Sequence, residues 1–256
     1  MALPSIVIML ITGFYNIADT FFVGKLSTQA TAAVGVVFSV MFFVQAIGFF
    51  FGHGSGNYIS RELGAQRHDN AQRMASTGFF LSFTLGIAVL LIGEACITPL
   101  SLWLGSTPTI LPYTEQYLGI SLLGTPFFTS SLTMNNQMRF QGNARLALWG
   151  ILSGAIVNVL LDPLFIFVFD MGVAGAALAT VIGQFVSFLI LLRMTYLGGN
   201  IRYSWRNFTP KVALFKEIIA GGTPSLSRQG LACIAMILLN TAASVYGDVA
   251  IAAMSI

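Results

Sequence analysis

Long apolar runs separated by short polar segments dominate the chain. Each run approaches or exceeds the roughly 20 apolar residues that an α-helix needs to cross a bilayer. Polar clusters, glycines and prolines mark the ends of the runs. The pattern predicts membrane-spanning helices near the following residues: 3–23, 34–58, 75–97, 112–135, 146–168, 173–195 and 217–243.

The composition supports a membrane protein. Hydrophobic residues make up 56% of the 256 residues and charged residues only 8%, with a mean hydropathy of +0.83, whereas soluble domains are roughly a quarter charged. The net charge of +3 is spread over short segments between apolar runs, so no extended basic face for nucleic acid is expected. Two cysteines without ligand spacing predict neither a disulfide framework nor a metal centre.

Basic residues gather in alternate connecting segments. Those near 60–73, 138–145 and 193–216 are basic, whereas Lys25 is the only basic residue in the other loops of this part of the chain. The positive-inside rule therefore predicts a cytoplasmic N-terminus in a multi-pass protein of the plasma (cytoplasmic) membrane. The N-terminus lacks a basic region and a cleavage site, so it is expected to be the first span rather than a signal peptide.

A weak internal repeat has an offset of 220 residues. "LPS" at 3–5 matches "TPS" at 223–225, and "ATAA" at 30–33 matches "AIAA" at 250–253. Six spans separate the copies, so both have the same orientation across the membrane. We expect the chain to contain the first lobe of a two-lobe, twelve-helix transporter, and to be a fragment of it or the product of a truncated reading frame. The predicted parts are a six-helix transmembrane bundle at 1–198, a cytoplasmic inter-lobe linker at 199–216 and the start of the second lobe, with a seventh helix, at 217–256.

Two carboxylates lie well inside predicted spans, Asp19 and Asp162. A carboxylate in hydrocarbon costs at least ~2.5 kcal/mol, so it requires a partner or a function. Asn158 lies four residues before Asp162, which places both on one helix face. Pro163 follows directly and loosens the backbone there.

A tight turn near Met171 places Asp162 level with Thr180 in the next helix, and Asp19 lies at a comparable depth in the first helix. Together with the carbonyl near Ala176 these groups form an oxygen-rich cluster that suits a hard cation such as Na⁺, and neighbouring carboxylates also suit a carried proton. The alternative is that Asn158 and Asp162 only cap the break at the proline; the cost of two aligned intramembrane carboxylates favours function.

The first helix has a mixed face on which Met9, Thr12, either Tyr15 or Asn16, and Asp19 recur at helical spacing. A thioether, a hydroxyl and aromatic surface suit a pocket for an amphipathic cation. The same Met and Tyr stripe also suits ordinary helix packing, and both interpretations stay open.

Other motifs do not indicate an enzyme. "GHGSGN" at 52–57 ends a membrane helix and follows no strand, so it is not a dinucleotide-binding fingerprint. The two aspartates lack the sequence context of an intramembrane aspartyl protease. His53 and His68 have no second ligand at metal spacing.

Six stretches resemble the multidrug and toxic compound extrusion (MATE) family, in its DNA-damage-inducible type. Residues 221–240, "GGTPSLSRQGLACIAMILLN", are similar to the seventh helix of that family. The other stretches follow the order and spacing of the first lobe. They are "NIADTFFVGKLSTQATAAVG" (16–35), "SRELGAQRHDNA" (60–71), "MRFQGNARLA" (138–147), "NVLLDPLFIF" (158–167) and "GVAGAALAT" (172–180).

The resemblance implies two six-helix bundles around a central cleft that exports cationic or amphipathic small molecules in exchange for Na⁺ or H⁺. It implies that the protein needs no cofactor beyond that ion and binds no nucleic acid. It also implies that membrane lipids surround the protein and that the complete protein is a monomer. The stretch that is similar to the seventh helix, 221–240, carries no carboxylate, so coupling would depend on the first lobe. The implied cation-site residues are Asp19, Asn158, Asp162, Thr180 and Ala176, and the implied substrate-site residues are Met9, Tyr15, Phe38 and Tyr117, the last near the cation site.

Two other functions remain open. A lipid-linked oligosaccharide flippase of the same superfamily would have a cationic cavity for an anionic lipid, whereas the interiors of the first-lobe spans contain no arginine. A truncated, non-transporting membrane remnant is the second alternative.

Overall fold

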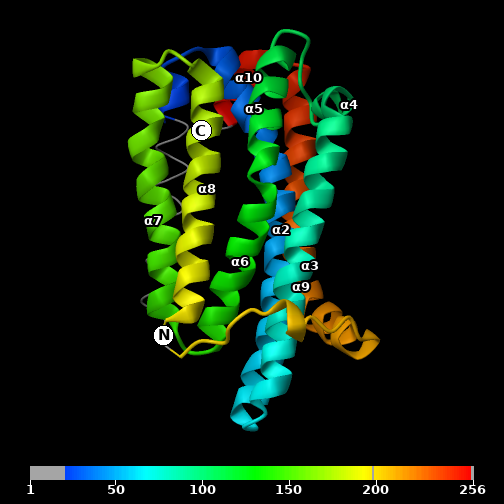
Figure 1. Cartoon of the computed structure of the whole chain (residues 1–256). Coiled ribbons are helices and arrows are strands. Elements are labelled where there is room, and N and C mark those ends of the chain that lie inside the picture. Colours follow the sequence, from blue (N-terminus) through cyan, green and yellow to red (C-terminus); the bar gives the residue numbers. More distant parts are fainter. Residues whose placement is uncertain (1–20, 198, 255–256) are drawn as a thin grey trace.

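The computed structural model describes residues 21–197 and 199–254 and shows a bundle of long helices (Figure 1). The connections between helices are short except for the segment before α9. The elements are α2 (Thr28–Gly64), α3 (His68–Ala95), α4 (Ile97–Trp103), α5 (Leu111–Leu123), α6 (Thr125–Phe140), α7 (Ala144–Pro163), the π-helical turn η1 (Leu164–Val168), α8 (Gly172–Tyr196), the 3₁₀ turn η2 (Trp205–Asn207), α9 (Val212–Ser244) and α10 (Asp248–Met254).

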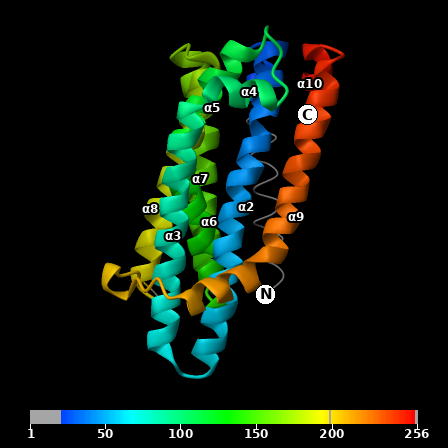
Figure 2. The same ribbon diagram turned by 90° about the vertical axis from the view of Figure 1, so that its right-hand side faces the viewer.

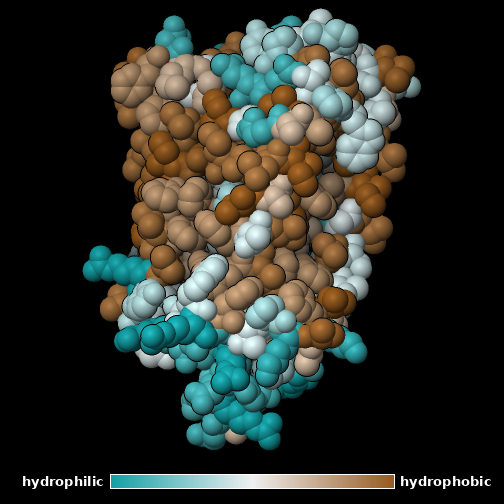
Figure 3. Space-filling model, turned by 45° about the vertical axis from the view of Figure 1, so that its right-hand side comes forward, coloured by the Kyte–Doolittle hydropathy of each residue, from teal (hydrophilic) through white to brown (hydrophobic). Residues whose placement is uncertain are grey.

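Five of these helices are long and apolar enough to cross a membrane by length and composition: α2, α3, α7 with η1, α8 and α9. The surface has a broad hydrophobic band with hydrophilic residues at both ends (Figure 3). This distribution is what a bilayer requires, because lipid covers the band and water covers the ends. The prediction of an all-α integral membrane protein is confirmed.

The predicted span at 112–135 is helical, but the structure divides it into α5 and α6 at Gly124. Pro126 has no N–H group to continue the helix. The hydroxyl of Thr125 donates to the carbonyl oxygens of Leu122 (2.8 Å) and Gly86 (3.0 Å). A Cβ atom on Gly124 would lie 2.1 Å from Oε1 of Gln184, so a larger residue here would displace the end of that side chain.

The basic segment predicted as a loop at 60–73 is also largely helical. α2 continues to Gly64 and α3 begins at His68, which leaves residues 65–67 between them. The backbone N–H of Arg67 donates to the carbonyl of Glu62 (2.8 Å) and closes the turn. These polar ends of α2 and α3 form a stem that projects beyond the rest of the bundle (Figures 1 and 2).

The connections lie at two ends of the bundle (Figures 1 and 2). We call the end with residues 65–67, 141–143 and 199–211 the basic end, because the three basic segments identified in the sequence lie there. The opposite end carries residues 96–110, 169–171 and 245–247. This grouping matches the alternation of charge along the sequence.

Helix α9 packs along α2 over most of its length. Near the basic end, a Cβ atom on Gly54 would lie 2.3 Å from the carbonyl oxygen of Ile218, so the two backbones approach closely. Nearer the opposite end, Nδ2 of Asn240 donates to Oγ of Ser39 (3.1 Å). Pro224 lies inside α9, and the helix bends in this region (Figure 2), as proline causes.

The 220-residue repeat extends to helix boundaries. α2 begins at Thr28 and α10 begins at Asp248, which is the same offset as the matching tripeptides and tetrapeptides. A short turn precedes each start, at 25–27 and 245–247. The two segments therefore have equivalent local structure.

Candidate cation site

The α7 helix changes its hydrogen-bonding pattern directly after Asp162. α7 ends at Pro163, and residues Leu164–Val168 form a π-helical turn. Proline lacks an N–H group and prevents the regular pattern from continuing, and π-helical turns of this kind are frequent at functional sites. The loosening predicted at this proline is therefore present in the backbone.

Close packing of α7 against α8 brings the predicted residues together. A Cβ atom on Gly183 would lie 2.9 Å from Cβ of Asn158 and 2.8 Å from the carbonyl oxygen of Gly154, so small residues are needed here. Nδ2 of Asn158 donates to Oγ1 of Thr180 (3.2 Å) and, at the limit of hydrogen bonding, to Oδ1 of Asp162 (3.5 Å). One amide thus connects the two helices and the carboxylate.

These three side chains are shielded from solvent. The exposed fractions are 1% for Asn158, 0% for Asp162 and 6% for Thr180. Burial weakens screening by water, so a charge on Asp162 interacts strongly with any cation placed beside it.

The other predicted residues in the described part of the chain lie in the adjoining core. Ala176 is one turn before Thr180 in α8, and Tyr117 of α5 is buried in the same hydrophobic cluster as Ala176. Phe38 of α2 is half-buried and packs against this cluster. Asp19, Met9 and Tyr15 lie outside the described residues.

The chemistry of the cluster suits a small hard cation or a proton. Oδ1 of Asn158 is buried and has no hydrogen-bond partner among the described residues. With the carboxylate of Asp162 and the hydroxyl of Thr180 it offers oxygen ligands of the kind that hard cations prefer. Within residues 21–197 and 199–254, no three His, Cys, Asp or Glu side chains gather to hold a metal ion, so a transition-metal centre is not indicated there.

Gln184 is a neighbour of the cluster that the sequence analysis did not place in the site. It lies one turn beyond Thr180 on the same face of α8, and its Oε1 atom is buried without a hydrogen-bond partner in the described structure. The four-residue spacing of Thr180 and Gln184 is the signal that could have identified it.

Arg228 of α9 was also not singled out. It is exposed among the described residues and lies close enough to His53 of α2 to interact electrostatically. A charged side chain inside a predicted span is expensive, and its position four residues after Pro224 could have drawn attention to it.

Comparisons with known proteins agree with the family resemblance seen in the sequence. A family model described as MatE matches residues 4–164. The chain is 28% identical over 257 residues to the multidrug export protein MepA of Staphylococcus haemolyticus (strain JCSC1435). That alignment covers all of this chain and 57% of the relative, so the chain spans little more than half of the relative's length.

Solved structures give the same result. The inward-facing conformation of a multidrug resistance MATE family transporter of the MOP superfamily matches with a TM-score of 0.88 and 28% identity, over 94% of this chain and 56% of that one. An outward-facing conformation of such a transporter matches with a TM-score of 0.86 and 28% identity, over 97% of this chain and 56% of that one. The fold described above is therefore similar to the corresponding part of both conformations.

Proposed function

Because this chain belongs to the MatE family of membrane transporters, we propose that the protein exports cationic or amphipathic small molecules across the cytoplasmic membrane, in exchange for Na⁺ or H⁺. The curated relative described above is a multidrug export protein. The basic end would face the cytoplasm, as the positive-inside rule requires. No cofactor beyond the coupling ion is needed, since the transported molecule undergoes no reaction.

One observation carries the proposal of ion coupling: the amide of Asn158 binds both Asp162 and Thr180 across the α7–α8 contact. A cation or proton that arrives at Asp162 changes the charge at the centre of this contact. The hydrogen bonds of Asn158 then have to rearrange, and so does the packing of α7 on α8. The charge state of Asp162 is thereby coupled to the arrangement of two helices.

Exchange follows if the ion and the exported molecule favour different arrangements of the bundle. With Asp162 ionised, the region around it is negative and would attract an organic cation. When an ion neutralises the carboxylate, this attraction is lost and the organic cation is released. Phe38 and Tyr117 supply aromatic surface near the cluster, to which Met9 and Tyr15 of the first helix would add.

The test is efflux of a fluorescent cationic dye from cells that express the protein, under an imposed Na⁺ or proton gradient. Asp162→Asn keeps the shape of the side chain and removes its charge, and it should lower ion-driven efflux at least about tenfold, or ~1.4 kcal/mol of coupling free energy. The gradient that drives efflux in the unsubstituted protein identifies the ion.

Asp170→Asn is the matched control. Asp170 is exposed at the turn between η1 and α8 with φ +52°, a conformation that asparagine also adopts readily. Efflux should be unchanged in this variant. Equal efflux in Asp162→Asn and the unsubstituted protein would show that ion coupling does not depend on the α7–α8 cluster.

Arg228 favours a second candidate function, a flippase for an anionic lipid-linked oligosaccharide. A flippase needs cationic groups within the membrane to accompany the phosphates of its substrate. Under the export proposal Arg228→Gln leaves dye efflux intact. If the unsubstituted protein exports no dye, but moves a fluorescent pyrophosphate-linked lipid between leaflets in an Arg228-dependent way, the flippase is the correct function.

A further inference from the structure

The segment between α8 and α9 is held firmly against the basic end over its described residues, 199–211. The hydroxyl of Tyr203 donates to Oε1 of Gln137 (2.8 Å), and the Tyr203 ring stacks on Phe79 with centroids 4.6 Å apart. The backbone N–H of Ser204 donates to Oγ of Ser76 (3.2 Å). The segment thus has a fixed inner side and a defined outer side.

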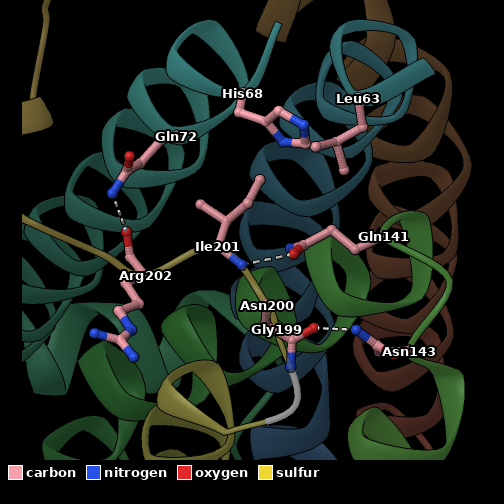
Figure 4. A pocket seen from close by; sticks show the side chains of 9 residues that line it. All are labelled: Leu63, His68, Gln72, Gln141, Asn143, Gly199, Asn200, Ile201 and Arg202. Carbon is pink, nitrogen blue, oxygen red and sulfur yellow. Dashed lines mark hydrogen bonds between the residues drawn. The ribbon is translucent and has the colours of Figure 1, made fainter. Parts of the chain in front are cut away.

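Further bonds fix the first half of this segment. The backbone N–H of Ile201 donates to Oε1 of Gln141 (2.9 Å), and Nε2 of Gln72 donates to the carbonyl oxygen of Arg202 (3.4 Å). Nδ2 of Asn143 donates to Oδ1 of Asn200. These residues line a pocket of about 320 Å³ between the segment and the stem (Figure 4).

The outer side of the segment presents aromatic surface. Trp205 is 71% exposed. Its ring meets Phe80 of α3 edge to face, with centroids 4.3 Å apart, and stacks with Phe208 at 5.8 Å. Two of its neighbours therefore orient the indole, although most of its surface is uncovered by the described residues.

Three exposed arginines lie in this segment or near the end of α8 that precedes it. Arg193, Arg202 and Arg206 are exposed, and the guanidinium of Arg202 lies 5.9 Å from the centroid of the Tyr196 ring. The sequence contains no Asp or Glu between Met171 and Lys216. These arginines therefore have no acidic side chain nearby in the sequence to neutralise them.

The position of the segment along α3 suits the interface of a membrane. Phe80 is twelve residues from His68, the first residue of α3, which corresponds to about 18 Å along the helix. The segment thus crosses α3 well above the tip of the stem, near the level at which α6 ends. The hydrophobic band of the surface gives way to hydrophilic residues toward this end (Figure 3).

This side of the bundle is also remote from the later helices. The segment projects on the side that carries α3 and α8, whereas the upper part of α9 and α10 lie on the other side (Figure 2). Lipid is the natural neighbour of an exposed indole in this position.

We propose that Trp205, Arg202 and Arg206 form a binding surface for anionic phospholipids of the cytoplasmic leaflet. The indole lies among the headgroups, where tryptophan is enriched, and the guanidinium groups bind the lipid phosphate in a bidentate manner. Each basic residue at an anionic membrane surface strengthens attraction roughly fivefold. The lipid would hold the segment between the two lobes at a fixed depth.

The experiment uses the fluorescence of Trp205 in liposomes. Trp103 and Trp149 are exposed and are replaced by phenylalanine, which keeps apolar surface at both positions. The protein is reconstituted in two kinds of liposome that contain phosphatidylglycerol and phosphatidylcholine at equal mole fractions. In one the phosphatidylglycerol is brominated, and in the other the phosphatidylcholine is brominated. Brominated phosphatidylglycerol should quench the fluorescence of Trp205 more than twice as strongly as brominated phosphatidylcholine does. Added salt should reduce this preference.

The Arg202→Gln/Arg206→Gln variant should bring the ratio of the two quenching efficiencies close to one. Arg67→Gln, at the exposed tip of the stem, removes a charge far along α3 from Phe80 and should leave the ratio unchanged. Thermal unfolding of each variant checks that it is folded.

Equal quenching by both lipids in the protein with all its arginines would overturn the proposal, as would a preference that survives loss of Arg202 and Arg206. Absence of quenching by either lipid would show that protein, not lipid, covers Trp205. The measurement involves no transport, so it succeeds or fails independently of the proposed export function.

Discussion

Two buried amides in this bundle have opposite hydrogen-bonding states. Gln137 of α6 uses all of its groups: Nε2 donates to Oγ of Ser55 (2.8 Å) and to the carbonyl oxygen of Ala75 (3.3 Å), and Oε1 accepts from Tyr203 (2.8 Å). Asn158 of α7 donates at 3.2 and 3.5 Å, and its Oδ1 atom has no partner among the described residues.

The difference separates a structural contact from a binding site. A network in which each donor and acceptor is satisfied adds rigidity and has nothing to offer a ligand. A buried acceptor without a donor, beside a buried carboxylate, is costly unless a cation or proton occupies the site during function. We therefore expect substitutions at Gln137 to lower stability and substitutions around Asn158 to lower transport.

The largest effect on stability is expected for Gln137→Ala. It leaves the hydroxyl of Tyr203 buried without its acceptor, and it removes the bonds that Nε2 donates to Oγ of Ser55 and to the carbonyl oxygen of Ala75. The unsatisfied hydroxyl alone costs about 1–3 kcal/mol. The free energy of unfolding in detergent should fall by about 3 kcal/mol, which would be visible as a lower melting temperature. Gln116→Ala, at an exposed position of α5, is the control and should melt normally. A normal melting temperature for Gln137→Ala would remove the basis of the comparison.

Compared with Gln137→Ala, Thr180→Val should lower the free energy of unfolding less and transport more. Valine keeps the shape and removes the hydroxyl that accepts from Asn158. Dye efflux should fall about tenfold, or ~1.4 kcal/mol, with little change in melting temperature. Thr195→Val removes a buried hydroxyl from the end of the same helix and should not affect efflux. The same loss of efflux in both variants would argue against a special role for the cluster.

The smallest effect is expected for Tyr203→Phe, which removes one hydrogen bond and keeps the stacking on Phe79. The cost should be about 1 kcal/mol near neutral pH. Burial raises the pKa of the Tyr203 phenol above its usual value.

The pH dependence of unfolding sharpens this prediction. Above the usual tyrosine pKa of about 10, the unfolded chain loses the phenol proton while the folded protein retains it, so the folded state binds more protons and stability falls as pH rises. The difference in stability between Tyr203→Phe and the unsubstituted protein should therefore shrink or reverse above about pH 10. A difference that stays constant with pH would mean that the phenol is accessible to solvent in the folded protein.

Local rules predict the α7–α8 cluster well. The four-residue spacing of Asn158 and Asp162 places them on one helix face, and a short turn near Met171 sets the level of Thr180 on the next helix. Both relations involve neighbours along the chain, so helix geometry alone determines them. The role of the cluster as a cation site stays a prediction, as do the roles of Asp19, Met9 and Tyr15.

Long-range contacts were not predictable in the same way. Oε1 of Gln184 lies against Gly124, 60 residues earlier, in the space that a Cβ atom would occupy. The network at Gln137 depends on Tyr203, 66 residues later. Propensity and hydrophobic pattern contain no information on which distant side chain fills such a space.

The sequence by itself determined the membrane class, most of the spans, the separation of basic and non-basic loops and the α7–α8 pairing, because bilayer thickness, charge asymmetry and helix period act locally. Only the tertiary structure decided where the predicted fourth span breaks, how far the stem projects, and that residues 199–211 lie across α3 with Trp205 outward. These features arise from packing between segments far apart in the chain, where shape complementarity and hydrogen-bond partners select one arrangement.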